Sequence, residues 1–471
     1  MGDELLITAS PYGMQAAAVA GGKPVAFFIE WSASPSRIGD LHVARPLGRM
    51  SGIDACIVDI GEGEEAFLQG ARTLDADGAP PIVQVVCDAY EGKRARVTRK
   101  PALAGRYAVF RPGGHGLIFS RRLGDPEVKR ALGAALDEVG ATGGTLTIRG
   151  AAAANPDAVP AAAATLAARW QEIEAAALRD RTPRRLLHAG GLLGRLLRDV
   201  AAPGTAHIAI DDRAALERAR ALAEGEAPDL AAAFSYAGAD RSETAPLFER
   251  HDCAGRLQAA LEPEVALPGS ARLTIEETRA LCAIDVDTSQ AAGAAAAETA
   301  EAAGREIVLR NLSGLIAIDF AGRGGTRRRE VQLKALKRAL AADRTPHRVL
   351  GVTAGGVVEV NRQRLGPSLR QALTEPAAGA FGGRRLRLEA AAHEAADAAR
   401  REAASGARSL TLRAAPPLLD ALARPGEDAL ARWLGIPVTL VSNPAEAHSR
   451  FVLERGGAPA AASNKGPCST R

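Results

Sequence analysis

The order of apolar and polar positions divides the chain into regions of different secondary structure. Short apolar runs bounded by glycine turns predict a β-hairpin over residues 3–31 and a series of short strands over residues 36–118, typical of a small barrel. The strand candidates in the second region are residues 41–44, 55–60, 82–86 and 107–110. Helical spacing predicts helices over residues 126–141 and within 151–180. Strands and helices alternate between residues 272 and 360, which predicts a mainly buried α/β sheet.

The remaining segments predict smaller units. Residues 186–255 show helical patterns around one clear strand at 206–210, and residues 386–454 have the pattern of a small αβ unit. The segment 375–385, which contains Gly and Pro, is predicted to be a linker. Residues 455–471 are predicted to be a disordered tail. The predicted fold class is therefore α/β, with several domains.

The composition favours a globular protein without a membrane segment. The chain has 471 residues, of which 47% are hydrophobic, and this length corresponds to roughly three domains. No apolar run approaches the ~18 residues that a membrane helix needs. The first residues lack the basic flank and apolar core of a signal peptide. We therefore expect a cytoplasmic protein that has no membrane partner.

The cysteines and histidines argue against a disulfide framework and a local zinc motif. The five cysteines are scattered and form no C-x-x-C pair, and their odd number disfavours a set of disulfides. The eight histidines form no H-x-x-x-H motif. We expect no zinc site built from local motifs.

The basic residues are clustered, although the net charge is only +4. The clusters are Arg94 with Arg96, Arg121-Arg122, Arg181 with Arg184-Arg185, and residues 323–329. Each cluster alone is typical of a solvated surface. Four of them in one chain favour a polyanionic ligand such as a nucleic acid.

Carboxylates stand at the ends of two predicted strands. Asp285 and Asp287 share one face of the strand over residues 281–286, because side chains alternate along a strand. Asp319 ends the strand over residues 315–320. Ligands bind near the carboxyl ends of strands in open α/β sheets, and adjacent carboxylates suit Mg²⁺ or Mn²⁺. Helix capping by Asp287, Thr288 and Ser289 is the alternative interpretation.

Several motifs, in chain order, resemble one family. Residues 278–287 read TRALCAIDVD and residues 313–320 read SGLIAIDF, which resemble the signature TEALTAIDVN followed by GGLIVIDF in the ribonuclease E/G family. The segments LPGS at 267–270 and VNRQRLGPSL at 360–369 resemble that family's LPSGG and SRQRLSPSL. Residues 37–45, and residues 53–61 followed by Phe67, resemble its S1 domain. The resemblance covers about residues 3–454.

The resemblance implies a division of the chain. Residues 1–35 and 186–255 would form a ribonuclease H-like subdomain, interrupted by an S1 barrel of the OB type at 36–118 and a 5′ sensor at 119–185. Residues 256–374 would form a DNase I-like catalytic domain. The linker 375–385, a small C-terminal αβ domain at 386–454 and the tail at 455–471 would follow.

The resemblance also implies roles for individual residues. Asp285 and Asp319 would hold Mg²⁺ and, with Asp287, would be catalytic. Phe67 and Lys93 fall at positions that the family uses to bind RNA, and Ile57 stands where the family has a second stacking phenylalanine. Gly105, Val109 and Arg149 match the pocket that reads a 5′-monophosphate in the family, and Arg149 would be its bidentate phosphate ligand.

The chain departs from the family pattern at several positions. Asp287 replaces an asparagine that orients the scissile phosphate, and an ionised carboxylate cannot donate a hydrogen bond. Gly150 replaces a threonine in the 5′ pocket, and Arg279 replaces a glutamate. Residues 374–385 contain no cysteine, so we expect no zinc link there, although a homodimer formed without zinc stays open. The absence of a long scaffold after the catalytic half indicates the shorter, ribonuclease G-like form.

The sequence therefore predicts an Mg²⁺-dependent endoribonuclease acting on single-stranded RNA, with a role in rRNA or mRNA processing or decay. Stimulation by a 5′-monophosphate is part of this prediction. Two alternatives stay open: an RNA-binding family member with weakened catalysis, and a DNA nuclease.

Overall fold

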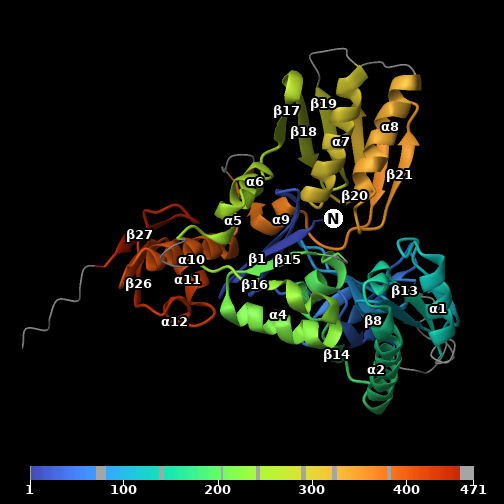
Figure 1. The fold of residues 1–471 in the computed structure, drawn as a ribbon. Coiled ribbons are helices and arrows are strands. Elements are labelled where there is room, and N and C mark those ends of the chain that lie inside the picture. Colours follow the sequence, from blue (N-terminus) through green and yellow to red (C-terminus); the bar gives the residue numbers. More distant parts are fainter. Residues whose placement is uncertain are drawn as a thin grey trace, which may run out of the picture.

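A computed structural model describes residues 2–70, 81–136, 143–202, 205–239, 244–287, 293–320, 326–378 and 383–456. These residues form a mixed α/β structure with several sheets (Figure 1). The N-terminal sheet lies near the centre of this view, the C-terminal unit lies at the left, and the sheet that carries the predicted acidic residues lies at the upper right. Among the described helices, none combines the length and the apolar character needed to cross a membrane.

The central sheet has five strands. In spatial order they are β16 (Phe234–Tyr236), β15 (His207–Ile210), β1 (Glu4–Ser10), β2 (Gly13–Ala20) and β3 (Lys23–Trp31). β1, β2 and β3 form an antiparallel meander, and β15 runs parallel to β1. The prediction of a two-stranded hairpin over residues 3–31 is wrong. The middle strand is rich in alanine, and small side chains give no strong apolar run.

Helices bury both faces of the central sheet. They are α3 (Gly191–Arg195), a π-helical turn (Leu196–Val200), α4 (Arg213–Glu226), α5 (Leu247–Arg250) and α6 (Cys253–Ala259). Leu5 and Ile7 of β1 share a buried cluster with residues of α3 and α4. Leu6 points to the other face and joins a cluster with residues of α5 and α6. The sheet is therefore apolar on both sides.

A seven-stranded sheet corresponds to most of the predicted barrel region. Its strands, in spatial order, are β14 (Arg184–Leu187), β4 (Leu41–Val43), β8 (Ile82–Cys87), β9 (Ala95–Thr98), β7 (Glu65–Gln69), β6 (Ala55–Asp59) and β5 (Arg45–Arg49). Alternate residues of β6, β7 and β8 are buried. Cys56, Leu68 and Val85 lie in the resulting core. The other side chains of these strands are left for the outer surface.

A separate four-stranded sheet follows. Its strands are β10 (Leu103–Ala104), β11 (Ala108–Pro112), β13 (Gly144–Ile148) and β12 (Leu117–Phe119), and it packs with α1 (Pro126–Leu136) and α2 (Val159–Arg179). The grouping of residues 107–110 with the barrel strands is wrong, because β11 pairs with β10 and β13. The sheet to which β11 belongs is determined by its pairing with β13, which is distant in the sequence, and local patterns do not reveal such a pairing.

The six-stranded sheet carries the predicted acidic residues. Its strands, in spatial order, are β17 (Glu264–Leu267), β18 (Ala271–Glu277), β19 (Leu281–Asp287), β20 (Gly314–Phe320), β22 (Val358–Arg362) and β21 (His347–Val352). Two helices, α7 (Gly293–Leu309) and α8 (Thr326–Leu340), join its core on one face. The opposite face exposes alternate residues of β19 and β20. The prediction of a mainly buried sheet is therefore correct for one face only.

The C-terminal part begins with α9 (Leu369–Leu373) and a pair of short strands, β23 (Thr374–Pro376) and β24 (Arg384–Leu386). The two ends of the predicted linker thus pair with each other as antiparallel strands. Residues 379–382 between them lie outside the described residues. The small unit that follows contains α10 (Leu388–Ala404), β25 (Leu410–Ala414), α11 (Pro416–Ala423), α12 (Ala429–Leu434), β26 (Val438–Ser442) and β27 (Phe451–Arg455). The predicted tail lies outside the described residues from residue 457 onward.

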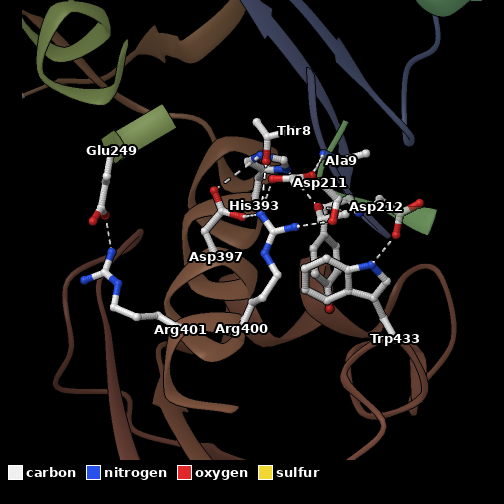
Figure 2. A network of polar contacts seen from close by, with 12 residues as sticks. Thr8, Ala9, Asp211, Asp212, Glu249, His393, Asp397, Arg400, Arg401 and Trp433 are labelled. Atoms are coloured by element: carbon white, nitrogen blue, oxygen red, sulfur yellow. Dashed lines mark hydrogen bonds and ion pairs between the residues drawn. The ribbon is translucent and has the colours of Figure 1, made fainter. Parts of the chain in front are cut away.

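A buried polar network joins α10 to the central sheet (Figure 2). Arg400 donates to Asp211, which directly follows β15, over 2.5 Å, and to Asp397 over 2.7 Å. It also donates to the hydroxyl of Thr8 on β1 over 3.1 Å. His393 lies 2.8 Å from the hydroxyl of Ser10. The small C-terminal unit is therefore attached to the N-terminal sheet of the same chain by charged groups away from water.

Candidate functional site

Asp285 and Asp319 are register partners on the parallel strands β19 and β20. Their neighbours Ile284 and Ile318 point into the core and are 1% and 0% exposed, whereas both aspartates lie on the exposed face. Neighbouring strands are about 4.8 Å apart. The fold therefore presents two carboxylates side by side, near the carboxyl ends of two adjacent strands.

Neither carboxylate of this acidic pair is neutralised by the part of the chain that the structure describes. No ion pair or hydrogen bond joins Asp285 or Asp319 to another described side chain. Two like charges held this close favour a cation between them. The segments that follow each strand, residues 288–292 and 321–325, lie outside the described residues, and so do the proposed capping residues Thr288 and Ser289.

Asp287 shares the open face but has a partner. It is the register partner of Arg272 on β18, which donates to its carboxylate over 3.3 Å. Arg272 also donates to Glu264 over 3.4 Å, and its hydrogen bond to the accepting carboxylate of Asp287 is the largest cause that raises the pKa of Arg272. The third carboxylate is thus in part balanced by a cation, whereas no cation among the described residues balances the acidic pair.

The donor set of the acidic pair fits Mg²⁺ or Mn²⁺. Among the described residues, no group of three or more His, Cys, Asp or Glu side chains comes together to hold a metal ion. Mg²⁺ is commonly bound through one or two carboxylates, with water and phosphate oxygens completing its octahedron. Two exposed carboxylates leave room for these oxygens, whereas a closed structural zinc site needs four protein ligands.

A cleft of about 980 Å³ separates the seven-stranded sheet from β21 and β22. The sequence-predicted residues Ile57, Phe67 and Lys93 come together in it. The cleft also contains Arg96 of the basic cluster noted in the sequence, and five residues to which the sequence assigned no role: Tyr90, Arg348, Leu350, Asn361 and Arg364. Asn361 and Arg364 belong to the motif over residues 360–369, which was noted for its resemblance alone. Basic and aromatic side chains together suit a single-stranded nucleic acid.

One row of register partners forms the outer surface of the seven-stranded sheet in this cleft. Ile57 of β6 pairs with Phe67 of β7, and Phe67 pairs with Arg96 of β9. The Arg96 guanidinium donates to the carbonyl of Arg364 over 2.9 Å. The row therefore runs from an apolar residue through an aromatic ring to a cation, and ends on the segment that follows β22.

The predicted 5′-end residues lie close together on the four-stranded sheet. Arg149 directly follows β13, and its Nη1 atom donates to the carbonyl of Gly105 over 2.8 Å. Val109 pairs with Ala104, the residue before Gly105. A Cβ atom added at Gly150 would stand 3.0 Å from the Cβ of Arg122. Glycine at this position thus lets Arg122 approach the backbone beside Arg149.

Asp199 gathers arginines from three parts of the chain around the 5′-end residues. It lies 2.8 Å from Arg149 and 2.9 Å from Arg198, and its carbonyl accepts a hydrogen bond from Arg344. Burial alone would raise the pKa of Asp199, but Arg198 and Arg149 outweigh burial and lower it. Burial, with the charges of Arg122 and Arg149, lowers the pKa of Arg344 to about 10. The surplus of positive charge favours binding of an anion.

Comparisons with known proteins show the family of this chain. A model of the Ribonuclease E/G family matches residues 102–365, which is more than half of the chain. The chain belongs to the ribonuclease E/G family. It is 28% identical over 403 residues to Ribonuclease G of Escherichia coli (strain K12), covering 79% of this chain and 81% of that relative. It is 27% identical to Ribonuclease G of Haemophilus influenzae over 82% of this chain and 84% of that relative. It is 28% identical to Ribonuclease E of Nostoc sp. over 74% of this chain and 54% of that relative.

The match to the ribonuclease E/G family covers the acidic pair and the 5′-end residues, but not the aromatic side of the cleft. Asp285, Asp319 and Arg149 lie inside residues 102–365, whereas Phe67 and Lys93 precede them. The family match therefore bears on the segment that contains the acidic pair, and not on the aromatic side of the cleft.

Proposed function

We propose that this ribonuclease E/G family member is an endoribonuclease that hydrolyses internal phosphodiester bonds of single-stranded RNA with a divalent cation. The observation that carries the proposal is the register pairing of Asp285 and Asp319 on the open face of the six-stranded sheet. The similarity to proteins named Ribonuclease G and Ribonuclease E supports the same reaction class. We further propose a role in rRNA or mRNA processing or decay in the cytoplasm.

Asp285 and Asp319 would hold Mg²⁺, or Mn²⁺ in its place. When bound there, the ion supplies charge stabilisation at the phosphate and lowers the pKa of a coordinated water. Hydrolysis forms a bond between the water oxygen and phosphorus and breaks the bond from phosphorus to the 3′ oxygen, which takes up the proton. The products are a 5′-phosphate and a 3′-hydroxyl. Asp287 can accept a hydrogen bond from the water, and Arg272 balances its charge beside the phosphate.

The cleft between the seven-stranded sheet and β21–β22 would bind the RNA strand. Phe67 offers a ring for base stacking, and Lys93 and Arg96 offer charge for the phosphates. In this proposal the seven-stranded sheet is the S1-type barrel and the six-stranded sheet is the DNase I-like catalytic domain. The central sheet would be the ribonuclease H-like subdomain. A homodimer, if one forms, would assemble without a zinc link.

The 5′ end of the RNA would bind at Arg149. Its Nη1 atom is held by Gly105 and Asp199, and no hydrogen bond from Nε or Nη2 to a described residue uses its other edge. That edge has the geometry for a bidentate phosphate contact. Cleavage would then be stimulated by a 5′-monophosphate.

The decisive experiment compares metal-dependent cleavage by two carboxylate variants. Wild-type protein should cut a 5′-monophosphorylated single-stranded oligoribonucleotide in Mg²⁺ and should stop cutting when EDTA is added. Asp319→Asn should reduce the rate at least a hundredfold, on the order of the loss of one essential charge-stabilising group. Glu276→Gln is the matched control, because Glu276 is an exposed carboxylate on the same face of the same sheet. Equal cleavage by wild type and Asp319→Asn would reject the proposal.

An RNA-binding protein with weakened catalysis is the second candidate. The observation that favours it is Asp287, which stands where the family has asparagine and is paired with Arg272. This candidate predicts RNA binding without cleavage in Mg²⁺ or Mn²⁺. A DNA nuclease would instead cut a single-stranded DNA of the same sequence faster than the RNA, so parallel RNA and DNA substrates separate all three.

A further inference from the structure

The cleft contains a second aromatic ring at a position that the sequence analysis did not single out. Position 57, the register partner of Phe67, carries isoleucine, so the surface row has a single ring. Tyr90 belongs to the turn between β8 and β9 and lines the same cleft as Ile57 and Phe67. The ring is half-buried, so part of its surface is open to a ligand.

The backbone around Tyr90 is a tight and well-anchored turn. Tyr90 and Lys93 exchange both backbone hydrogen bonds, of 3.1 and 2.8 Å. The two residues between them have positive φ angles, 43° at Glu91 and 77° at Gly92, as in the twisted two-residue turns of β-hairpins. A non-glycine residue rarely adopts such a conformation, so the neighbouring structure has to hold it.

Contacts from the C-terminal half hold this turn in place. Arg384 of β24 forms an ion pair with Glu91 at 3.0 Å. Gln371 of α9 donates to the same carboxylate over 3.5 Å. The turn is thus fixed from outside the seven-stranded sheet, and Tyr90 and Lys93 are presented together with little conformational freedom. A ring that is already ordered loses little entropy when a ligand stacks on it.

Two cations flank the Tyr90 ring. The Arg364 guanidinium lies 5.1 Å from the ring centroid and the Lys93 ammonium lies 5.2 Å from it. Arg364 is itself fixed, because it donates to the carbonyl of Ser313 over 3.0 Å. Ser313 directly precedes β20, the strand of Asp319. The ring is therefore placed where a base could stack while the adjacent cations contact the phosphates.

We infer that Tyr90 is the second base-stacking surface of the cleft and takes over the role that an aromatic residue at position 57 would have. The inference rests on the proposed RNA-binding function of the cleft. The two stacking residues would then be Phe67 on strand β7 and Tyr90 in the turn between β8 and β9. Since the cleft also contains Asn361 and Arg348, which lie in register with Leu315 on the exposed face, a strand stacked on Tyr90 would lie against the open face of the six-stranded sheet.

The test measures binding by the full-length protein with Asp319→Asn as background, so that the RNA stays intact. The probe is a fluorescein-labelled ten-nucleotide oligoadenylate, and its Kd is measured by anisotropy. Tyr90→Ala should raise the Kd about tenfold, and Tyr90→Phe should stay within about twofold because the ring is kept. Tyr236→Ala is the matched control. Tyr236 is 41% exposed, has the Arg213 guanidinium 4.2 Å from its ring centroid and lies outside the cleft. This variant should bind like the background protein.

A second probe separates stacking from a merely structural role. An oligomer of the same length and charge with abasic sugars has phosphates but no bases, so Tyr90→Ala should leave its Kd unchanged. An equal loss for both probes would overturn the inference, because Tyr90 would then only support the backbone of the cleft. An unchanged Kd for oligoadenylate in Tyr90→Ala, together with weaker binding by Phe67→Ala, would also overturn it but would leave the proposed function standing. Unchanged binding in both variants would reject the cleft as the RNA site.

Discussion

Arg149 is held at one end of its guanidinium by Asp199. The same Nη1 atom lies 2.8 Å from the Asp199 carboxylate and 2.8 Å from the carbonyl of Gly105. Asp199 belongs to the π-helical turn after α3, which packs on the central sheet, so this turn orients the residue that follows β13 of the four-stranded sheet. Contacts of this kind fix the orientation of a side chain that binds a ligand.

The first prediction concerns this contact. Asp199→Asn should raise the KM for a 5′-monophosphorylated RNA about tenfold, because a charge-assisted hydrogen bond is lost. The kcat, and the cleavage of the same RNA with a 5′-hydroxyl, should stay unchanged. Asp180→Asn is the control, since Asp180 forms an exposed ion pair with Arg184 elsewhere on the chain. A parallel loss with both RNAs would show that Asp199 serves folding and not 5′-end recognition.

The second prediction concerns Asp287. Asn can accept the same hydrogen bond, can also donate one, and adds no repulsion toward phosphate. Asp287→Asn should therefore keep kcat within about twofold, whereas Asp287→Ala should lower it at least tenfold, as expected for loss of a polar group that contacts the transition state. Initial rates at saturating Mg²⁺ measure both. Full activity of the alanine variant would remove Asp287 from the catalytic set.

The third prediction tests the buried network between α10 and the central sheet. Arg400 and Asp211 are 9% and 3% exposed, so removal of the guanidinium leaves a carboxylate uncompensated away from water. Arg400→Met should lower the free energy of unfolding by about 3 kcal/mol, measured by urea denaturation. Arg401→Met on the same helix breaks an exposed pair with Glu249 and should cost under about 1 kcal/mol. Similar losses in both variants would contradict the assigned role of the network.

The fourth prediction concerns pH and His393. Burial, together with the nearby charge of Arg400, lowers the pKa of this histidine to about 4. The unfolded chain binds a proton near pH 6.5, whereas the folded protein keeps the ring neutral until about pH 4. The contribution of neutral His393 to the free energy of unfolding is therefore complete above pH 6.5. It is lost as the pH falls toward 4, and the loss is at most about 3 kcal/mol.

Urea denaturation between pH 4 and 7 checks this prediction. His393→Gln has no proton to take up and should show a flatter dependence of stability on pH than wild type. His115→Gln, at an exposed histidine, should follow the wild-type curve. A His393→Gln curve parallel to that of wild type would assign the acid sensitivity to other groups.

The acidic pair was predictable because its signal is local. Alternation within the strands of Asp285 and Asp319 fixes which side chains share a face, and a helix between two strands favours their parallel pairing. The structure adds the exact register, which places one aspartate beside the other. Ile57, Phe67 and Lys93 were predicted from the resemblance to the ribonuclease E/G family, and the structure brings them together in one cleft.

Other parts of the fold depend on contacts that no local pattern contains. The alanines of β2 form a strand because β1 and β3 flank them, not because of their own propensity. Tyr90 gained its position from a turn anchored by Arg384, which is almost three hundred residues away in the sequence. The Arg149–Asp199 contact likewise joins the residue after β13 to the helical turn that packs on the central sheet. Such pairings follow from tertiary structure, and a single sequence does not encode them in its periodicity.

The parallel pairing of β19 with β20 has a consequence for when activity arises. Asp285 and Asp319 become neighbours only after the intervening helix α7 has crossed the sheet and returned the chain to the same edge. A slip of one residue in either strand would turn its aspartate into the apolar core. A nascent or partly folded chain would thus lack the complete acidic pair, and we expect the proposed cleavage of RNA only once this unit has folded correctly.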